Sequence, residues 1–217
     1  ALNKWASNGY VGSIIAGTGF GKSRCGVLAV GNTLDNNPDS VGVVLVPTTQ
    51  LQEQFKEEFI KWNYEHLLDR VDVMCYQSAY KLKGNHYDIV VCDEIHLGLS
   101  PEYRKFFENN TYKRLLCMTA TLPEDLEYKE LLDTISPIAY RITLDECVNL
   151  GLVSPYEVIC VPVELTSVEQ QEYKKANNTF VYAKYVLGQF DAFDQARYIM
   201  GAGKHTATQQ EKAAAAQ

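Results

Sequence analysis

The sequence predicts an α/β fold in which a mostly parallel sheet is flanked by helices, with a helical extension at the C-terminal end. Two observations predict it. Short apolar runs alternate with longer amphipathic stretches, and the runs are continuous in Val, Ile and Leu instead of alternating with polar residues. Continuous apolar runs are typical of parallel strands buried on both faces. Strand and helix repeated in this order favour a doubly wound sheet, whose ligands lie at the carboxyl ends of its strands.

Five apolar runs are the expected strands. They span residues 12–16, 41–46, 71–76, 89–92 and 115–118. A helix is expected at residues 50–61, because an apolar stripe runs from Leu51 to Trp62 at spacings of three and four. Thr49 and Gln52 have the spacing of a capping box at the start of this helix.

The pattern changes after about residue 140. Thr143 and Glu146 form a second capping-box pair, and Gly151 is the expected stop of the short helix that follows. Residues 158–165 are expected to form a strand, and a long helical region is expected to begin at Ser167 with Gln170 as its capping partner. Its aromatic residues are Tyr173, Phe180, Tyr185, Phe190 and Phe193, and their pattern favours packing over the stacking of nucleic-acid bases.

The composition is that of an ordinary globular protein, with 46% hydrophobic and 22% charged residues among 217. The formal net charge of −7 predicts weak, local contact with nucleic acid in place of a broad basic surface. No apolar run is long enough to cross a bilayer, so no membrane partner is expected. Six cysteines without a C-x-x-C pair indicate a reducing, cytoplasmic or other intracellular compartment, and a phage or virus is among the candidate sources.

A glycine-rich segment follows the first expected strand and precedes an expected helix. It consists of Ala16, Gly17, Thr18, Gly19, Phe20, Gly21, Lys22 and Ser23. Glycines let backbone N–H groups approach a phosphate chain, and the helix dipole favours negative charge there. Lys22 is expected to reach the β- and γ-phosphates of a nucleotide, and Ser23 to place its hydroxyl on Mg²⁺. The alternative is a glycine-rich turn without a ligand.

Two adjacent carboxylates end the fourth expected strand. The segment reads Ile89-Val90-Val91-Cys92-Asp93-Glu94-Ile95-His96. Asp93 is expected to hold Mg²⁺ through water, and Glu94 to orient or deprotonate the attacking water. Lys22, Asp93 and Glu94 are therefore the candidate catalytic residues. A solvated strand end is the alternative for the two carboxylates, and a purely structural role is the alternative for His96.

Together these two segments resemble motifs I and II of superfamily 2 helicases of the D-E-x-H type. The segment Met118–Pro123 is similar to motif III of that family, which couples hydrolysis to nucleic-acid binding. The resemblance gives coupling roles to His96, Thr119, Ala120 and Thr121.

Two further segments resemble elements of the same family that contact the nucleic-acid backbone. Pro47 and Thr48 lie in a segment similar to motif Ia, and Gln77 and Ser78 lie in a T-Y-Q-like element. On the residues alone, Thr48 is equally a helix cap, and Tyr76 is equally a core residue.

The resemblance implies a RecA-like ATP-binding domain at residues 1–143, which contains the four motifs. Residues 144–217 would then be a crossover segment and helical extension that begin a truncated second domain. Residues 151–156 resemble the crossover in the branch with type III restriction subunits and phage or repair DNA helicases. The second RecA-like domain, with its arginines, and the adenine-recognising segment are expected outside the given sequence.

The function implied is the ATP- and Mg²⁺-binding lobe of a helicase or translocase that acts on nucleic acid, DNA in the first place, and that hydrolyses ATP poorly alone. The alternatives are a non-catalytic nucleotide-binding module and another phosphate-loop enzyme such as a kinase. Residues 201–206 resemble a second phosphate loop, but Tyr198 and His205 replace its first glycine and its Ser or Thr. A break between helices is expected there, before an alanine-rich end at residues 211–217.

Overall fold

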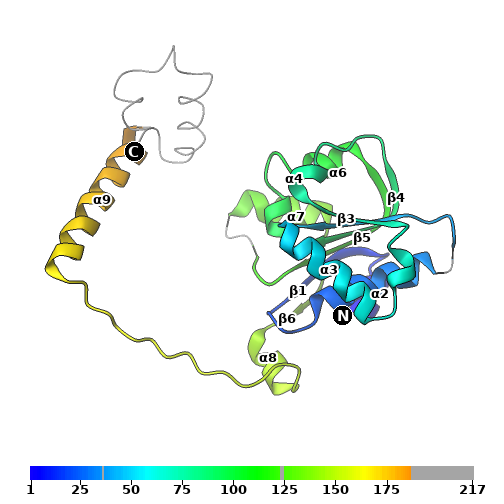
Figure 1. The fold of residues 1–217 in the computed structure, drawn as a ribbon, viewed down its shortest axis with the longest axis horizontal. Helices are drawn as coiled ribbons and strands as arrows, with labels where there is room; N and C mark the ends of the chain where they lie inside the picture. The colour runs from blue at the N-terminus through cyan, green and yellow to red at the C-terminus, as the bar shows by residue number, and fades with distance from the viewer. Residues whose placement is uncertain (36, 123–124, 187–217) are drawn as a thin grey trace, which may run out of the picture. The chain divides into compact units, whose positions relative to one another are not determined.

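The computed structural model describes residues 1–35, 37–122 and 125–186 (Figure 1). The chain separates into two compact units, Ala1–Tyr156 and Glu157–Gln217. The first unit contains the whole sheet, and the second contains one long helix among its described residues. The domain boundary expected after residue 143 stays a prediction, since a compact unit is defined by contacts and a motor domain by its motifs.

Helices and strands alternate through the first unit, as expected. In chain order they are α1 (Leu2–Ser7), β1 (Val11–Ala16), α2 (Lys22–Leu34), β2 (Gly42–Val46), α3 (Thr49–Lys61), the short 3₁₀ helix η1 (Glu65–Leu67), β3 (Val71–Cys75), α4 (Tyr76–Ala79), β4 (His86–Asp93), α5 (Ile95–Gly98), α6 (Lys105–Asn109), β5 (Thr111–Thr119), α7 (Leu126–Ile135), β6 (Ile138–Ile142) and α8 (Leu144–Asn149). Each of the five expected strands is present, which confirms the α/β fold class.

The strands form one six-stranded sheet in the order β3-β2-β4-β5-β1-β6. Every pairing in it is parallel. The edge strand β6 was not expected, because Arg141 and partly exposed neighbours interrupt its apolar pattern. An edge strand has one paired side and needs less apolar surface than a central strand, so its sequence signal is weaker.

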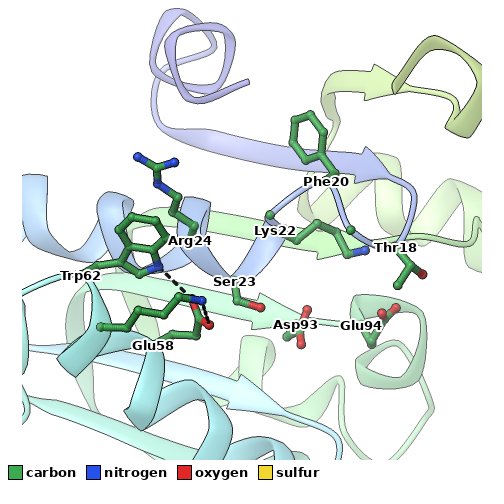
Figure 2. Close-up of a pocket in the computed structure, with 12 residues that line it drawn as sticks. Thr18, Phe20, Lys22, Ser23, Arg24, Glu58, Trp62, Asp93 and Glu94 are labelled. Carbon is green, nitrogen blue, oxygen red and sulfur yellow. Dashed lines mark hydrogen bonds and ion pairs between the residues drawn. The ribbon is translucent and has the colours of Figure 1, made fainter. Parts of the chain in front are cut away.

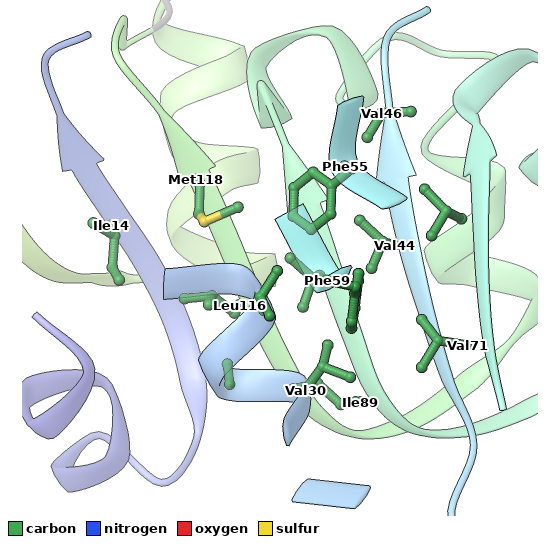
Figure 3. Close-up of a cluster of buried hydrophobic side chains, with 14 of the residues drawn as sticks. Ile14, Val30, Val44, Val46, Phe55, Phe59, Val71, Ile89, Leu116 and Met118 are labelled. Carbon is green, nitrogen blue, oxygen red and sulfur yellow. The ribbon is translucent and has the colours of Figure 1, made fainter. Parts of the chain in front are cut away.

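Helices cover both faces of the sheet, and alternate residues of the central strands belong to two separate clusters of buried side chains. Val44, Val91, Leu116 and Met118 pack with α2 and α3, whereas Val43, Val90, Leu115 and Cys117 pack with residues of α4 to α7. Figure 3 shows the first cluster, in which Phe55 and Phe59 of α3 lie over the strands. The continuous apolar runs are thus buried on both faces, as predicted.

The helix after the glycine-rich segment lies close to the sheet because Gly26 has no side chain. A Cβ atom at Gly26 would lie 2.8 Å from Phe55 Cζ, 3.2 Å from Met118 Cε and 3.2 Å from Val91 Cγ1. Side chains of α3 and of two strands therefore fix the position of α2. The start of α2 carries the candidate phosphate-binding residues, so their position depends on this contact.

The start and end of α3 differ from the sequence prediction. Thr48 is the N-cap, and its hydroxyl accepts a hydrogen bond from the Leu51 N–H at 3.3 Å. The capping box predicted at Thr49 and Gln52 is wrong by one residue, because Thr48 is the last residue in extended conformation before the helix. Trp62, predicted as the end of the buried stripe, is a half-buried C-cap.

The end of the first unit follows the sequence prediction. Thr143 caps α8, and its hydroxyl and N–H are both bonded with Glu146, which confirms the capping box. Gly151 has a positive φ of 67° and follows the helix, as expected for a helix stop.

In the second unit, the strand predicted at residues 158–165 is wrong. Residues 154–166 form no regular structure. The apolar side chains Val158, Ile159, Val161 and Val163 are at least 73% exposed, and Cys160 is exposed with them. A strand needs a neighbour to pair with its backbone, and the described part of this unit contains no other strand.

The long helix of the second unit is present as α9 (Ser167–Val186). Its capping pair is Thr166 and Glu169, one residue before the predicted pair at Ser167 and Gln170. Phe190, Phe193, the loop-like segment at 201–206 and the alanine-rich end at 211–217 lie outside the described residues. Within the described ranges, no helix is long and apolar enough to cross a membrane.

The close packing of α2 is testable through Gly26→Ala. Alanine favours a helix, but its methyl group would overlap the Phe55 ring, so we expect this variant to lower the free energy of unfolding by about 1–3 kcal/mol. In a Phe55→Leu background the loss should be smaller, since leucine lacks the Cζ atom. Urea unfolding of the four proteins measures this coupling. Equal losses in both backgrounds would show that Gly26 does not set the contact.

Candidate nucleotide-binding site

The carboxyl ends of three neighbouring strands lie side by side at one edge of the sheet. The register pairs Ile15 of β1 with Thr119 of β5, and Asp93 of β4 with Met118 of β5. A cavity of about 530 Å³ opens at this edge (Figure 2). It is lined by Thr18, Gly19, Phe20, Gly21, Lys22, Ser23, Arg24, Glu58, Lys61, Trp62, Asp93 and Glu94. The structure thus brings the glycine-rich segment and the carboxylate pair together, as the sequence predicted.

The glycine-rich segment turns sharply from β1 into α2. Gly19 and Gly21 have φ angles of 85° and 92°, in the left-handed region that favours glycine. Gly21 is the N-cap of α2 and provides no side-chain cap. The start of this 13-residue helix therefore lines the cavity, and its N-cap offers no side chain to accept from the first N–H groups. Such a helix start attracts anions, phosphate groups above all.

Lys22 folds back over the same segment. Its Nζ donates hydrogen bonds to the carbonyl oxygens of Ala16 at 3.0 Å and Gly17 at 3.4 Å. A Cβ atom at Gly17 would lie 3.3 Å from Leu144 Cδ1, so the first residue of α8 packs closely against this segment. The ammonium group is held next to the loop, where a phosphate chain would replace its carbonyl partners.

Asp93 and Glu94 place two carboxylates at the end of β4, and the negative charge there is only partly balanced. Asp93 is 9% exposed, and burial together with the nearby charge of Glu94 raises its pKa to about 6. The Lys22 charge acts in the opposite direction but does not cancel the effect. Because ionisation of the Asp93 carboxyl group is unfavourable here, a cation beside it would stabilise the charged form. The site therefore suits a divalent metal ion.

Ser23 and Asp93 are the residues that fit Mg²⁺. Within the described residues, no group of three or more His, Cys, Asp or Glu side chains is arranged to hold a metal. A phosphate-loop site does not require such a group, because one hydroxyl, one carboxylate, phosphate oxygens and water complete the coordination. Both side chains line the cavity, and Figure 2 shows them facing each other across it.

Glu94 has an unusual backbone conformation. Its φ of 47° and ψ of 55° lie in the left-handed region, which non-glycine residues rarely adopt. Its carboxylate oxygen Oε2 lies 2.9 Å from Thr119 Oγ1 and 3.4 Å from His96 Nδ1. A strained residue held by side-chain contacts at the mouth of a cavity has the geometry of a functional site.

Thr119 connects Glu94 with the rest of the predicted coupling segment. Its hydroxyl lies 2.9 Å from His96 Nδ1, 3.0 Å from the Thr121 carbonyl and 3.1 Å from the Thr121 nitrogen. Thr121 is exposed and Ala120 is half-buried. The structure therefore brings His96, Thr119 and Thr121 into one hydrogen-bonded group with Glu94, while Pro123 lies outside the described residues.

The residues expected to contact nucleic acid lie outside the cavity. Pro47 and Thr48 follow β2, and Gln77 and Ser78 follow β3, so they lie along the other half of the same sheet edge. Thr48, Gln77 and Ser78 are exposed, and Thr48 also caps α3. Tyr76 is buried and donates a hydrogen bond to the Asp93 carbonyl at 2.8 Å, which confirms its alternative reading as a core residue.

Four residues that line the cavity were not expected there. They are Arg24, Glu58, Lys61 and Trp62. The last three lie at the end of α3, and Trp62 packs against Arg24 of α2, so this end of α3 reaches the cavity. The one local signal is a tryptophan at the limit of an apolar stripe, a pattern that predicts core packing and not a cavity wall.

The sequence of the first unit matches a known protein family. The family described as type III restriction enzyme, res subunit, matches residues 1–124, which is more than half of the chain. The chain belongs to this family. The match covers the glycine-rich segment, the carboxylate pair and Thr119 to Thr121.

Two solved structures share the fold of this family member. The helicase domain of Pyrococcus furiosus Hef has a TM-score of 0.56 and 15% identity, covering 94% of this chain and 54% of that one. The Sulfolobus solfataricus SWI2/SNF2 ATPase core in complex with dsDNA has a TM-score of 0.53 and 17% identity, covering 93% and 54%. The chain thus spans about half the length of each. None of the curated proteins matches the sequence.

The family match and the shared fold confirm the predicted resemblance to superfamily 2 helicases. The first unit has the α/β fold of the Hef helicase domain and of the Sulfolobus ATPase core.

The charge imbalance at Asp93 predicts a change of stability with pH. The folded pKa of about 6 exceeds the ordinary 3.8, so the folded state holds the proton more tightly than the unfolded chain, and stability falls as pH rises through this range. We expect Asp93→Asn to be more stable than the parent by about 3 kcal/mol at about pH 8 in EDTA. The difference should disappear below about pH 4.

Asp88→Asn is the control, measured by the same urea unfolding. A hydrogen bond from Lys113 lowers the pKa of Asp88, so this substitution should destabilise the protein at about pH 8. If Asp93→Asn also destabilised the protein at that pH, the charged carboxyl group would be stabilised by its surroundings, and the argument that this site suits a cation would fail.

Proposed function

We propose that the chain binds Mg·ATP and is the ATP-hydrolysing lobe of a helicase or translocase that acts on DNA. One observation carries the proposal: Lys22 and Ser23 at the start of α2 face Asp93 and Glu94 at the end of β4 across one cavity. Phosphoryl transfer to water requires this pairing: groups that donate hydrogen bonds to the phosphate oxygens, and carboxylates that hold Mg²⁺ and orient the water. Family membership makes the nucleotide-driven motor the natural context.

In this proposal the helix start and Lys22 neutralise the phosphate chain. Backbone N–H groups from Gly19 to Ser23 would donate to the phosphate oxygens, and the ammonium of Lys22 would exchange its carbonyl partners for them. Ser23 and Asp93 would hold Mg²⁺, which supplies charge neutralisation on the phosphates. With these charges present, Asp93 would be ionised at neutral pH.

Glu94 is the residue proposed to orient the attacking water. Its carboxylate faces the cavity at the phosphate end, and its strained backbone fixes its direction. The hydrogen bonds through Thr119 and His96 connect it to Thr121, which is exposed at the sheet edge. This group provides the route by which nucleic acid at the surface would influence hydrolysis.

The nucleic-acid strand would lie along the sheet edge over β2 and β3. Pro47, Thr48, Gln77 and Ser78 provide small polar side chains and backbone groups, which position a phosphate backbone without reading sequence. DNA is proposed as the substrate because the related Sulfolobus ATPase core is solved with dsDNA. The net charge of −7 leaves this lobe with weak affinity.

The first test is Lys22→Ala in a titration of the 217-residue chain with a fluorescent ATP analogue and Mg²⁺. Hydrogen bonds to charged groups contribute about 1.5–3 kcal/mol, so we expect about a tenfold loss of affinity or more. Lys56→Ala, which removes a partly exposed lysine of α3 outside the cavity, should bind as the parent does. Equal affinities of parent and Lys22→Ala would remove the phosphate-loop assignment.

The second test concerns hydrolysis. The cations that line the cavity are Lys22, Arg24 and Lys61 among the described residues, and Figure 2 places Arg24 away from Glu94. Arginine fingers contribute ~10³–10⁵ to phosphoryl transfer rates. We therefore expect the 217-residue chain to bind ATP but to release phosphate slowly, with little stimulation by single-stranded or duplex DNA at low salt.

Glu94→Gln separates binding from chemistry in the same assay. It should keep the affinity for Mg·ATP and lose the residual turnover, since it retains the shape of the side chain but not its basicity. Strong DNA-stimulated turnover by the parent would show that this lobe suffices. Full turnover by Glu94→Gln would show that another group orients the water.

A further inference from the structure

The cavity has two ends of different chemistry. One end carries Lys22 and the carboxylates of Asp93 and Glu94, where the terminal phosphate would react. The other end carries Arg24 and Trp62 with Glu58 beside them. Figure 2 shows these two groups on opposite sides of Ser23. A nucleoside triphosphate also has two different ends, because its reacting phosphate and its base lie at opposite ends of the molecule.

The second end is a flat, fixed surface. The guanidinium carbon of Arg24 lies 4.0 Å from the centroid of the Trp62 ring, so the guanidinium covers one face of the indole. Trp62 Nε1 donates to Glu58 Oε2 at 2.7 Å, and Lys61 Nζ donates to Glu58 Oε1 at 2.8 Å. The tryptophan is thus held through its edge and its face, and Arg24 presents a planar cation to the cavity.

Planar cations and aromatic rings are the groups on which nucleobases stack. Each Glu58 oxygen accepts one hydrogen bond from within α3 and its C-cap, and a carboxylate oxygen can accept a second. Burial raises the pKa of Glu58, but the hydrogen bonds from Lys61 and Trp62 outweigh this and leave the pKa lowered. The carboxylate therefore remains an acceptor for an N–H of the base or an O–H of the ribose.

We propose that Arg24, stacked on Trp62 and flanked by Glu58, is the platform for the base of the bound nucleotide. The ligand class is a nucleoside triphosphate. The phosphate loop would hold the triphosphate, and the end of α3 would receive the nucleoside. The inference rests on the proposed function, because a base reaches this platform only if the phosphates occupy the loop.

The test compares two ligands that share the phosphates and differ in the nucleoside: ATP and inorganic tripolyphosphate, each with Mg²⁺, by calorimetric titration of the 217-residue chain. Arg24→Ala and Trp62→Ala should each weaken ATP binding by about tenfold, the worth of one stacked base, and leave tripolyphosphate binding unchanged. Arg24→Lys keeps the charge without the plane and should behave as Arg24→Ala. Trp62→Phe keeps a flat ring and should retain most of the ATP affinity.

Tryptophan fluorescence gives an independent readout. The chain has two tryptophans, and Trp5 is 3% exposed with its Nε1 bonded to the Leu115 carbonyl, so it gives a constant background. ATP should change the emission of Trp62, and tripolyphosphate at saturation should not. Lys56→Ala, outside the cavity, should match the parent in every measurement.

The outcomes separate this inference from the proposed function. If Arg24→Ala weakens both ligands equally, Arg24 acts on the phosphates, and the platform is refuted while the phosphate site stands. The same conclusion follows if the parent binds tripolyphosphate as tightly as ATP, or if Arg24→Lys binds ATP as the parent does. If the parent binds neither ligand, the phosphate-loop assignment fails, and the platform fails with it.

Discussion

The parallel register of β4, β5 and β1 is the constraint on which the candidate site depends. These three strands are neighbours, and their hydrogen bonds bring Asp93, Thr119 and the end of β1 to the same height. No loop has to fold back to assemble the site, because each motif begins where its strand ends. Buried apolar residues on both faces hold this register, since a slip of one residue would exchange the side chains that a strand packs into the two clusters.

Three features at this edge are each unfavourable without a ligand, and one ligand could stabilise all of them. Asp93 is disfavoured in its charged form, Glu94 has a strained backbone, and the α2 start has no side-chain cap. Each of these features costs stability in the protein alone, and each suits a ligand that brings both phosphate and a divalent cation. Packing elsewhere compensates, above all the close contact of α2 with the sheet at Gly26.

Most of the fold could be predicted from the sequence because its signals are local. Continuous apolar runs identified the central strands, and glycines followed by Lys22 and Ser23 identified the turn into α2. Features that depend on neighbours could not be predicted. The exposed run around Val161 has strand composition, but the described part of its unit contains no strand to pair with it. Trp62 reaches the cavity only because the end of α3 packs against Arg24 of α2. No local pattern contains the packing of two helices, so the sequence pointed to the phosphate end of the site and missed the other.

The hydroxyl of Thr119 has one proton, and more than one acceptor lies within reach of it. Glu94 Oε2 is 2.9 Å away, the Thr121 carbonyl is 3.0 Å away, and His96 Nδ1, which accepts in one tautomer, is 2.9 Å away. The proton can be donated to one of them at a time, so the carboxylate and the exposed turn compete for it. A partner that moves the Thr121 carbonyl by about 1 Å would end this competition in favour of Glu94, since hydrogen bonds weaken steeply with poor geometry. Contact at the surface would thereby change the hydrogen bonding of a carboxylate inside the cavity without any movement of the sheet.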